Sequence, residues 1–514
     1  MSPLDPIELQ VITGALRAAC EEMGATLVRA AHSANIKERR DASTALFDRG
    51  GEMVMQAEHI PVHLGSMPAA VRAVLAQEHR PGVSWILNDP FEGGTHLPDI
   101  TVITPVFADE KETERTAGVR AADGPLIGFA ASRAHHADVG GRIPGSMPAD
   151  SRTLEEEGVV ISPQPMTEEA IERIVARMRQ PRERRADLRA QLAANRIGAI
   201  RLEELAQRVG AERLREATEG VLDYAERRTR ACIAALGDGM REAHDVLEAP
   251  EGDLELRLRA TVQGQRMTLD FSGSAEQHGG NLNCPLPVTL SACWFAVRVL
   301  TDPDIPPSAG AYRPVRVIAP EGSLLNANPG AAVVAGNVET SSRVADLVME
   351  AFGRAVGQGT MNNLTLGDER FSYYETLGGG QGACPDAEGP SAVHVAMSNT
   401  LNTPIEALER ELPLRVTEYA LRRGSGGHGR HRGGDGVIRE LEALSDMTFS
   451  LIAERRRHAP RGADGGAPGQ RGHDRLMAPG EQDGQVLPGK VTGKLRAGER
   501  LRIETPGGGG HGAS

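Results

Sequence analysis

The stretch Ile100-Thr-Val-Ile-Thr-Pro-Val-Phe107, followed by Leu126-Ile-Gly-Phe-Ala-Ala131, decides the fold of the N-terminal third of this chain. Both runs are apolar and β-rich, and a charged segment separates them, so they predict a β-hairpin. Positions equidistant from a hairpin tip face each other across its two strands. Asp99 and His135 lie at equal distances in sequence from Ala117, and we therefore expect them to be neighbours.

Two clusters of potential metal ligands flank this hairpin: Asn88-Asp-Pro-Phe-Glu-Gly-Gly-Thr-His-Leu-Pro-Asp99 and Arg133-Ala-His-His-Ala-Asp138. Imidazole nitrogens and carboxylate oxygens are the ligands of catalytic zinc, iron and manganese sites. Pro98 disfavours a helix between His96 and Asp99, so both side chains can project from one rigid loop at the start of a strand. The alternative is that these histidines belong to ordinary surface turns.

An earlier hairpin is predicted from strands at 43–47 and 53–57, which are joined by a glycine-containing turn. Asp41 and His59 lie just outside its open ends, and they are further candidate ligands together with His63. Because two arginines precede Asp41, this residue is equally compatible with a buried, ion-paired structural role.

The whole chain is expected to be a multi-layer mixed α/β (α+β) protein with four regions. Residues 1–165 form the hairpin-rich, metal-binding α+β region, which begins with an amphipathic helix at 7–32, and residues 166–250, with charged amphipathic helices from 167 to 242, form a separate helical layer. Residues 251–419 form a mixed α/β module with strands at 254–262 and 267–271 and helices at 287–300 and 343–356. Residues 420–514 form a glycine-rich region of short strands between turns.

Charge and cysteine usage limit the classes of partner. The net charge is -13 and acidic residues are spread along the chain, which argues against nucleic acid or an anionic membrane as a partner. The five cysteines are an odd number at wide spacings, without a CxxC pair or a secretory leader, which indicates a reducing compartment. No apolar stretch approaches the ~18 to 20 residues of a membrane span. We therefore expect a cytoplasmic protein.

Several motifs together resemble one known family. They are ERRD (38–41), QAEHIPVHLGSM (56–67), NDP with GGTHLPD (88–99), RAHHADVGG (133–141), GNVETS (336–341), GGQG (379–382), TLNTP (400–404), RGGDG (432–436) and TPGGGG (505–510). Through them the chain resembles the hydantoinase B and oxoprolinase family, which includes the B subunits of N-methylhydantoinases and the alpha subunits of acetone and acetophenone carboxylases. The sequence departs from the family pattern in a charged insert at 111–122, at the hairpin tip and away from the ligands.

The resemblance implies one divalent metal ion (zinc, manganese or iron) held by the residues at Asp41, His96, Asp99 and His135, with His136 as the alternative to His135. It also implies a hetero-oligomer with a separate ATPase subunit of the hydantoinase A/oxoprolinase type. This chain has no GxxxxGK[ST] phosphate loop, so we expect the partner to use the ATP.

The implied activity is ATP-dependent hydrolysis of a cyclic amide such as a hydantoin, a lactam or 5-oxoproline. His136, Asp138 and Glu92 lie beside the predicted ligands in sequence, and they could act as the general base or as hydrogen-bond partners that orient the ligands. Two alternatives remain open: the alpha subunit of an ATP-dependent ketone carboxylase, and a non-catalytic assembly subunit with a structural metal.

Two further segments have alternative interpretations. The glycines at 378–382 could cradle an anion with their backbone amides or form a tight turn. Arg343 and residues 337–342 could bind polar groups of the substrate, although Ser341 also precedes an apolar helical pattern and could act near its N-cap.

Overall fold

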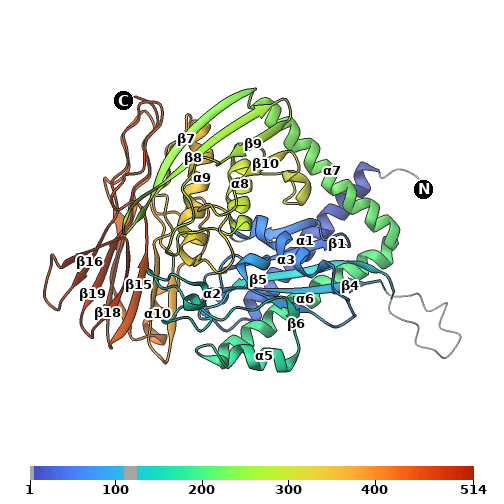
Figure 1. Ribbon diagram of the computed structural model, residues 1–514, viewed down its shortest axis with the longest axis horizontal. Helices are drawn as coiled ribbons and strands as arrows, with labels where there is room; N and C mark the ends of the chain where they lie inside the picture. The colour runs from blue at the N-terminus through green and yellow to red at the C-terminus, as the bar shows by residue number, and fades with distance from the viewer. Residues whose placement is uncertain (1–4, 59, 109–123, 514) are drawn as a thin grey trace.

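The structure is a computed structural model that describes residues 5–58, 60–108 and 124–513, so the charged insert at 111–122 lies outside the described residues. Four sheets and their covering helices form a mixed α/β architecture, which confirms the predicted fold class. In Figure 1 the blue N-terminal elements lie in the centre and to the right, the red C-terminal strands form the left edge, and the yellow-green strands β7 and β8 lie above, with the green helix α5 at the bottom.

The N-terminal region is built on a six-stranded antiparallel sheet with the order β2-β1-β5-β4-β3-β6. Its strands are β1 (Ala42–Asp48), β2 (Met53–Glu58), β3 (Trp85–Leu87), β4 (Asp99–Phe107), β5 (Leu126–His135) and β6 (Gln164–Pro165). Both predicted hairpins are confirmed, because β1 pairs with β2 and β4 pairs with β5. The register places Asp99 opposite His135, as their equal distance from the hairpin tip predicts.

Helices cover both faces of this sheet. The helices of this region are α1 (Pro6–Ala30), α2 (Ala34–Lys37), α3 (His63–Leu75), α4 (Leu154–Glu157), α5 (Glu168–Val175), α6 (Pro181–Val209) and α7 (Ala211–Ala235). Leu46 and Ala130 face the core that α1 and α6 share, while their strand neighbours Phe47 and Phe129 face α3. Of the helices predicted within 166–250, α6 packs on the N-terminal sheet, so this region is not a separate layer.

The middle of the chain forms a second sheet with the order β10-β9-β8-β7. Its strands are β7 (Gly239–Ala249), β8 (Gly252–Gln263), β9 (Arg266–Asp270) and β10 (Val315–Ile318), and α8 (Leu286–Leu300) and α9 (Ser341–Ala351) contribute to the same core. β7 begins inside the stretch that the sequence predicts to be helical as far as residue 242. From Met240 to Leu247 more exposed and less exposed side chains alternate, which is the two-residue period of a strand. The amino-acid composition of this segment does not reveal the change, because it resembles that of the preceding helices.

The C-terminal part contains two further sheets, with the orders β12-β11-β15-β18 and β13-β14-β19-β16-β17. Their strands are β11 (Asn363–Gly367), β12 (Ser372–Glu375), β13 (Leu414–Arg422), β14 (Gly436–Ala443), β15 (Met447–Ile452), β16 (His473–Met477), β17 (Gln485–Leu487), β18 (Lys490–Leu495) and β19 (Arg500–Glu504), and α10 (Ile405–Glu411) precedes β13. The two sheets share one apolar core that includes Leu366, Phe449 and Leu501. Because β11 pairs with β15, one sheet crosses the boundary predicted between residues 419 and 420.

The glycine clusters of this part are not strands. Residues 378–390, 424–436, 460–470 and 505–512, which we call the glycine bundle, lie against one another backbone to backbone. The Gly508 amide donates to the Gly434 carbonyl at 2.9 Å, and the Gly434 amide donates to the Gln381 carbonyl at 2.9 Å. A Cβ on Gly508 would lie 2.0 Å from the Gln381 oxygen, so only glycine permits this approach.

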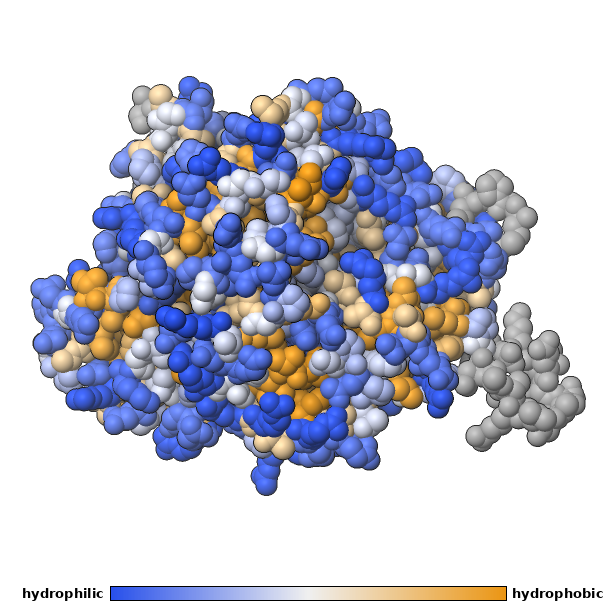
Figure 2. Space-filling model, in the orientation of Figure 1, coloured by the Kyte–Doolittle hydropathy of each residue, from blue (hydrophilic) through white to orange (hydrophobic). Residues whose placement is uncertain are grey.

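No helix in the described part of the chain is long and apolar enough to cross a membrane. On the face drawn in Figure 2, hydrophobic residues occur in separate patches among hydrophilic ones. All five cysteines are free thiols.

Candidate metal centre

A narrow cavity lies where the N-terminal sheet meets the segments that follow α8. It encloses about 320 Å³ of empty space including its mouth, and it is lined by Asp41, Ile60, Val62, His63, His96, Asp99, His135, Asn337, Val338, Met361, Tyr374, Thr376, Met397, Ser398, Asn399 and Thr400. All four residues predicted to hold a metal line this cavity. Asn399 is exposed, so the cavity reaches the surface there.

Three of these four residues converge on one point. His96 Nε2, His135 Nδ1 and Asp99 Oδ1 form a triangle in which each pair of atoms is 3.1 Å apart. Ligands that bind a first-row metal at ~2.0 to 2.2 Å are separated from one another by about 3 to 3.5 Å. His96, Asp99 and His135 could therefore hold a metal ion, and two imidazoles with one carboxylate suit zinc, manganese or iron.

The backbone fixes these ligands from both sides. Asp99 is the first residue of β4 and His135 the last residue of β5, so the register of the hairpin sets their separation. The loop before β4 is held by Asn88, whose Nδ2 donates to the Leu97 carbonyl at 2.7 Å and whose Oδ1 accepts from the Ile161 amide at 2.7 Å. The ligand loop is thus fixed by one hydrogen bond within the loop and one from Ile161 outside it.

The two oxygens of Asp99 have different partners. Oδ2 accepts a hydrogen bond from Thr95 Oγ1 at 2.6 Å and lies 3.6 Å from His63 Nε2, which leaves Oδ1 to the two ligand histidines. Burial alone would raise the pKa of Asp99, but positive charge on His96 and hydrogen bonds from His135, His63 and His96 lower it well below its usual range. Asp99 is therefore a carboxylate at neutral pH, as a ligand must be.

A stack of side chains orients His135. The Tyr374 ring lies parallel to the imidazole at 4.5 Å between centroids, and the Arg39 guanidinium covers Tyr374 at 4.4 Å. Arg39 donates to the Tyr374 carbonyl at 2.7 Å and to the hydroxyls of Thr376 and Thr400 at 3.0 and 3.1 Å. This stack joins the N-terminal ligands to segments more than 300 residues later in the chain.

The remaining candidates from the first hairpin have different positions. Asp41 is buried on the cavity wall, outside the three-atom group, and no ion pair joins it to Arg39 or Arg40 within the described residues. His63 is fully buried; its Nδ1 pairs with Ser43 Oγ at 2.9 Å, and its Nε2 lies 3.6 Å from Asp99 Oδ2. His59 lies outside the described residues.

The structure does not bring His136, Asp138 and Glu92 to the cavity. His136 follows the last residue of β5, and its Nε2 lies 3.0 Å from Gln191 Oε1 on α6. Asp138 accepts hydrogen bonds from the amides of Gly140, Gly145 and Arg179 and from the Arg179 guanidinium. Glu92 is exposed. Extended backbone alternates its two sides, so His136, next to His135, faces away from the cavity.

His136 and His135 should consequently respond differently to substitution. We expect His136→Ala to leave the metal content unchanged and to lower the free energy of unfolding by about 1 to 3 kcal/mol, because Gln191 loses a buried partner. Elemental analysis and urea denaturation measure the two quantities. Loss of the metal from a folded His136→Ala chain would contradict the assignment of His135 as the ligand.

Two interpretations left open by the sequence are now decided. The amides of Gly379, Gly380 and Gln381 donate to the carbonyls of Val393, Pro506 and Pro390, so this glycine run neither cradles an anion nor forms a free turn. Arg343 is fully buried and pairs with Asp245 and Glu454, away from the cavity.

Ser341 lies near the start of a helix, as expected, whereas Tyr374 was not among the predicted site residues. Ser341 is the first residue of α9, one position after the N-cap Thr340, and its Oγ donates to the Asn337 carbonyl at 2.6 Å. Tyr374 carries no local pattern that indicates a site, since it is an ordinary residue of β12. Only the packing of distant segments brings it onto His135.

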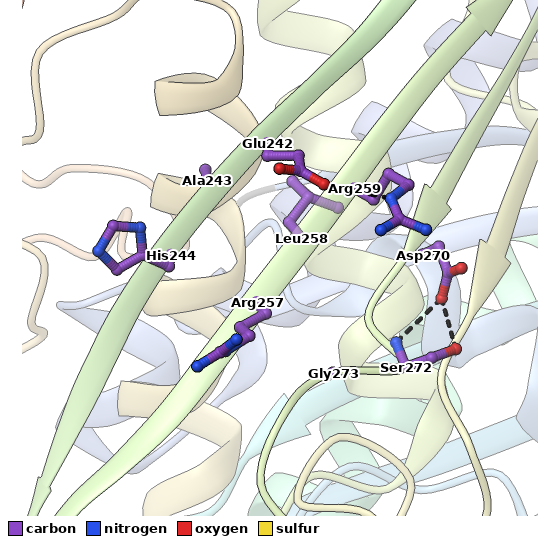
Figure 3. Close-up of a pocket in the computed structure, with 9 residues that line it drawn as sticks. All are labelled: Glu242, Ala243, His244, Arg257, Leu258, Arg259, Asp270, Ser272 and Gly273. Atoms are coloured by element: carbon purple, nitrogen blue, oxygen red, sulfur yellow. Dashed lines mark hydrogen bonds and ion pairs between the residues drawn. The ribbon is translucent and has the colours of Figure 1, made fainter.

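A second hollow of about 1180 Å³, open to solvent, lies on the outer face of β7, β8 and β9 (Figure 3). Its charged side chains pair locally: Arg259 lies 3.3 Å from Glu242, and Asp270 Oδ1 accepts from the amide and hydroxyl of Ser272. Antiparallel sheets commonly have one such solvated face. The candidate site is therefore the cavity lined by His96, Asp99 and His135.

Comparison with known structures shows the same fold elsewhere. The ATP-dependent caprolactamase from Pseudomonas jessenii superposes with a TM-score of 0.90 at 26% identity, covering 100% of this chain and 92% of that chain. The nucleotide-free acetone carboxylase superposes with a TM-score of 0.85 over 99% of this chain and 76% of that chain, at 18% identity. The second likeness shows the fold alone.

Sequence relatives cover the chain from end to end. It is 38% identical to 5-oxoprolinase 1 of Arabidopsis thaliana over 99% of its length, but spans only 42% of that protein. It is 29% identical to the B subunit of a putative D-/L-hydantoinase of Pseudomonas sp. (strain NS671), with 100% of this chain and 90% of that protein covered. The sequence model of the family described as hydantoinase B/oxoprolinase matches residues 5–514. The chain therefore belongs to the hydantoinase B/oxoprolinase family.

Proposed function

We propose that this chain is the metal-dependent subunit of an ATP-dependent amidohydrolase that opens a cyclic amide, such as a hydantoin, a lactam or a 5-oxoproline-like ring. In this proposal a separate ATPase subunit of the hydantoinase A/oxoprolinase type activates the ring, and the two subunits form a cytoplasmic hetero-oligomer. The relatives support a cyclic-amide substrate, since their names include 5-oxoprolinase, hydantoinase and caprolactamase.

The observation that carries the proposal is the convergence of His96 Nε2, Asp99 Oδ1 and His135 Nδ1 inside a cavity. Three protein ligands leave positions open for water or substrate, which is typical of catalytic rather than structural sites. Asp41, on the same wall, is proposed as the fourth residue that holds the ion; a five- or six-coordinate ion would still keep a position for water or substrate. A divalent ion there would supply Lewis acidity, which polarises a carbonyl oxygen and lowers the pKa of water.

The residues around the ligands would have separate roles in the reaction. Thr95 and His63 keep Oδ2 of Asp99 occupied, so that Oδ1 stays directed at the two histidines. His63 is the cavity residue proposed to exchange a proton with the substrate, because its Nδ1 is held by Ser43 and its Nε2 lies in the cavity wall, 3.6 Å from Asp99 Oδ2. Ile60, Val62 and Met397 line the cavity and provide apolar contacts for the carbons of a ring.

The proposal predicts that removing the metal abolishes ring opening. The purified chain is combined with an ATPase subunit of the hydantoinase A type, ATP and a panel containing 5-oxoproline, hydantoin and caprolactam, and the ring-opened product and ADP are measured. After chelation we expect the product to fall by at least about a hundredfold, and one equivalent of metal to restore it.

The same assay separates the alternatives. Product formed from a cyclic amide without bicarbonate supports the amidohydrolase, whereas turnover that requires a ketone and bicarbonate would identify a carboxylase. Ring opening that continues unchanged in the metal-free complex would assign the ion a structural role and contradict the proposal.

A further inference from the structure

Residues 336–340 form a single turn of π-helix, η4 (Gly336–Thr340), directly before α9. Such turns occur mostly as one-residue expansions of a helix and are frequent at functional sites. Gly336 is required here, because a Cβ at this position would lie 1.9 Å from the Asn283 carbonyl oxygen. The turn therefore lies directly on the backbone of the 281–284 segment, which fixes the direction of Asn337.

Buried polar groups anchor this turn at both ends. Thr340 Oγ1 donates to the Leu282 carbonyl at 2.6 Å. On the other side, the carboxylate of Glu157 accepts hydrogen bonds from the amides of Val333 and Val334, each at 3.1 Å. All of these groups are buried, so the turn presents Asn337 from a rigid support.

The side chain of Asn337 is buried, with 3% of its surface exposed, and it lines the cavity that contains the three metal ligands. Its backbone carbonyl accepts from Ser341 Oγ, but its side-chain Oδ1 has no hydrogen-bond donor within the described residues. A buried acceptor without a donor is unfavourable, and native proteins rarely keep one without a functional reason. The unpaired oxygen in this cavity therefore indicates a ligand that carries a donor.

We propose that Asn337 accepts a hydrogen bond from the amide N–H of the cyclic substrate, and thereby selects rings with an N–H over rings alkylated on that nitrogen. This inference rests on the proposed function. A cyclic amide presents a carbonyl oxygen and an N–H on adjacent atoms; the carbonyl faces the ligands His96, Asp99 and His135, and the N–H faces Asn337. The neutral amide oxygen of Asn337 suits the neutral N–H of the ring. A site built to accept a hydrogen bond from this N–H rejects analogues without it, because its own buried oxygen would be left unpaired.

The test uses the full chain with its metal content measured. The probes are five-, six- and seven-membered lactams and hydantoin, each compared with its N-methyl derivative by calorimetry or saturation-transfer NMR. In the wild type we expect at least one N–H probe to bind about tenfold more tightly than its N-methyl partner, as one hydrogen bond of ordinary net strength gives. Asn337→Leu should abolish that ratio at unchanged metal content, and Glu92→Gln, at an exposed position outside the cavity, should keep it.

Three results would overturn the inference: a wild type that binds no N–H probe, a wild type without preference, or a preference that persists in Asn337→Leu. If that variant does not fold, Asn337→Ala replaces it, since alanine also lacks the acceptor and should likewise abolish the preference. The proposed function fails separately, if the chain with its ATPase partner opens no cyclic amide. If the chain prefers N–H probes in binding but opens no ring, the role of Asn337 is supported and the proposed function is contradicted. If the ring is opened but no N–H preference is found, only the role of Asn337 is contradicted.

Discussion

Asp99→Asn is expected to lower the metal content from about one divalent ion per chain to a small fraction of that, while the fold is kept. Asparagine has the same shape and can still accept from Thr95 Oγ1, which donates to Asp99 at 2.6 Å. Asparagine lacks the negative charge of the carboxylate, which would attract the cation and whose Oδ1 lies 3.1 Å from both histidine nitrogens. A Lewis-acid metal contributes several kcal/mol to catalysis, so we expect ring opening to fall by about a thousandfold.

The measurement is elemental analysis of the folded variant beside the wild type, with circular dichroism to verify the fold and the ring-opening assay to report activity. Thr95→Val is the matched control, because it removes a hydrogen bond to Asp99 and no ligand atom. We expect it to weaken metal binding by about 10- to 100-fold, without abolishing it. Equal metal content in the folded Asp99→Asn variant and the wild type would show that Asp99 is not a ligand.

The hairpin that carries two of the ligands could be predicted from local sequence. Its strands are runs of apolar and β-branched residues, and antiparallel pairing relates positions by simple symmetry, so Asp99 was expected opposite His135 and lies there. The choice between His135 and His136 could not be made in the same way. It depends on which side of β5 faces the cavity, and that depends on α6, where Gln191 binds His136.

The other wall of the cavity could not be predicted, because it comes from distant segments. Tyr374 carries no periodicity or spacing that connects it with His135. Residues 337–342 are candidate binders of substrate polar groups, but nothing in the sequence places Asn337 beside His135, because both approaches depend on tertiary packing. The boundaries between regions could not be predicted for the same reason. Sheets and cores join segments across them, as β11 and β15 do on either side of residue 420.

Composition was misleading where glycine is abundant. Gly and Pro clusters usually indicate turns between short strands, but in this chain the clusters form the glycine bundle, whose backbone segments hydrogen-bond to one another directly. The bundle also supports the cavity. Thr505 Oγ1 donates to the Gly378 carbonyl at 2.9 Å, and the Leu377 amide donates to the Met361 carbonyl at 3.0 Å, which fixes the chain immediately after Thr376 on the cavity wall.

Gly508→Ala is therefore expected to destabilise the protein by about 4 kcal/mol, a large part of the ~5 to 15 kcal/mol that keeps a typical domain folded. The added Cβ would lie 2.0 Å from the Gln381 carbonyl oxygen and 2.3 Å from its carbon. Both atoms belong to the backbone, so no rotamer change can relieve the overlap, and the Gly508–Gly434 and Gly427–Gly508 hydrogen bonds would be strained together.

Gly279→Ala is the matched control for this substitution, because no atom lies within 4 Å of a Cβ at that position and its φ is not in the left-handed region. We expect Gly279→Ala to change the free energy of unfolding by less than about 1 kcal/mol, measured by urea denaturation of both variants. The bundle fixes the segment that carries Thr376, so Gly508→Ala should also lower ring-opening activity in whatever fraction stays folded. Equal stability of the two variants would show that the glycine bundle can expand to admit a methyl group, and that its close packing does not hold this wall of the cavity in place.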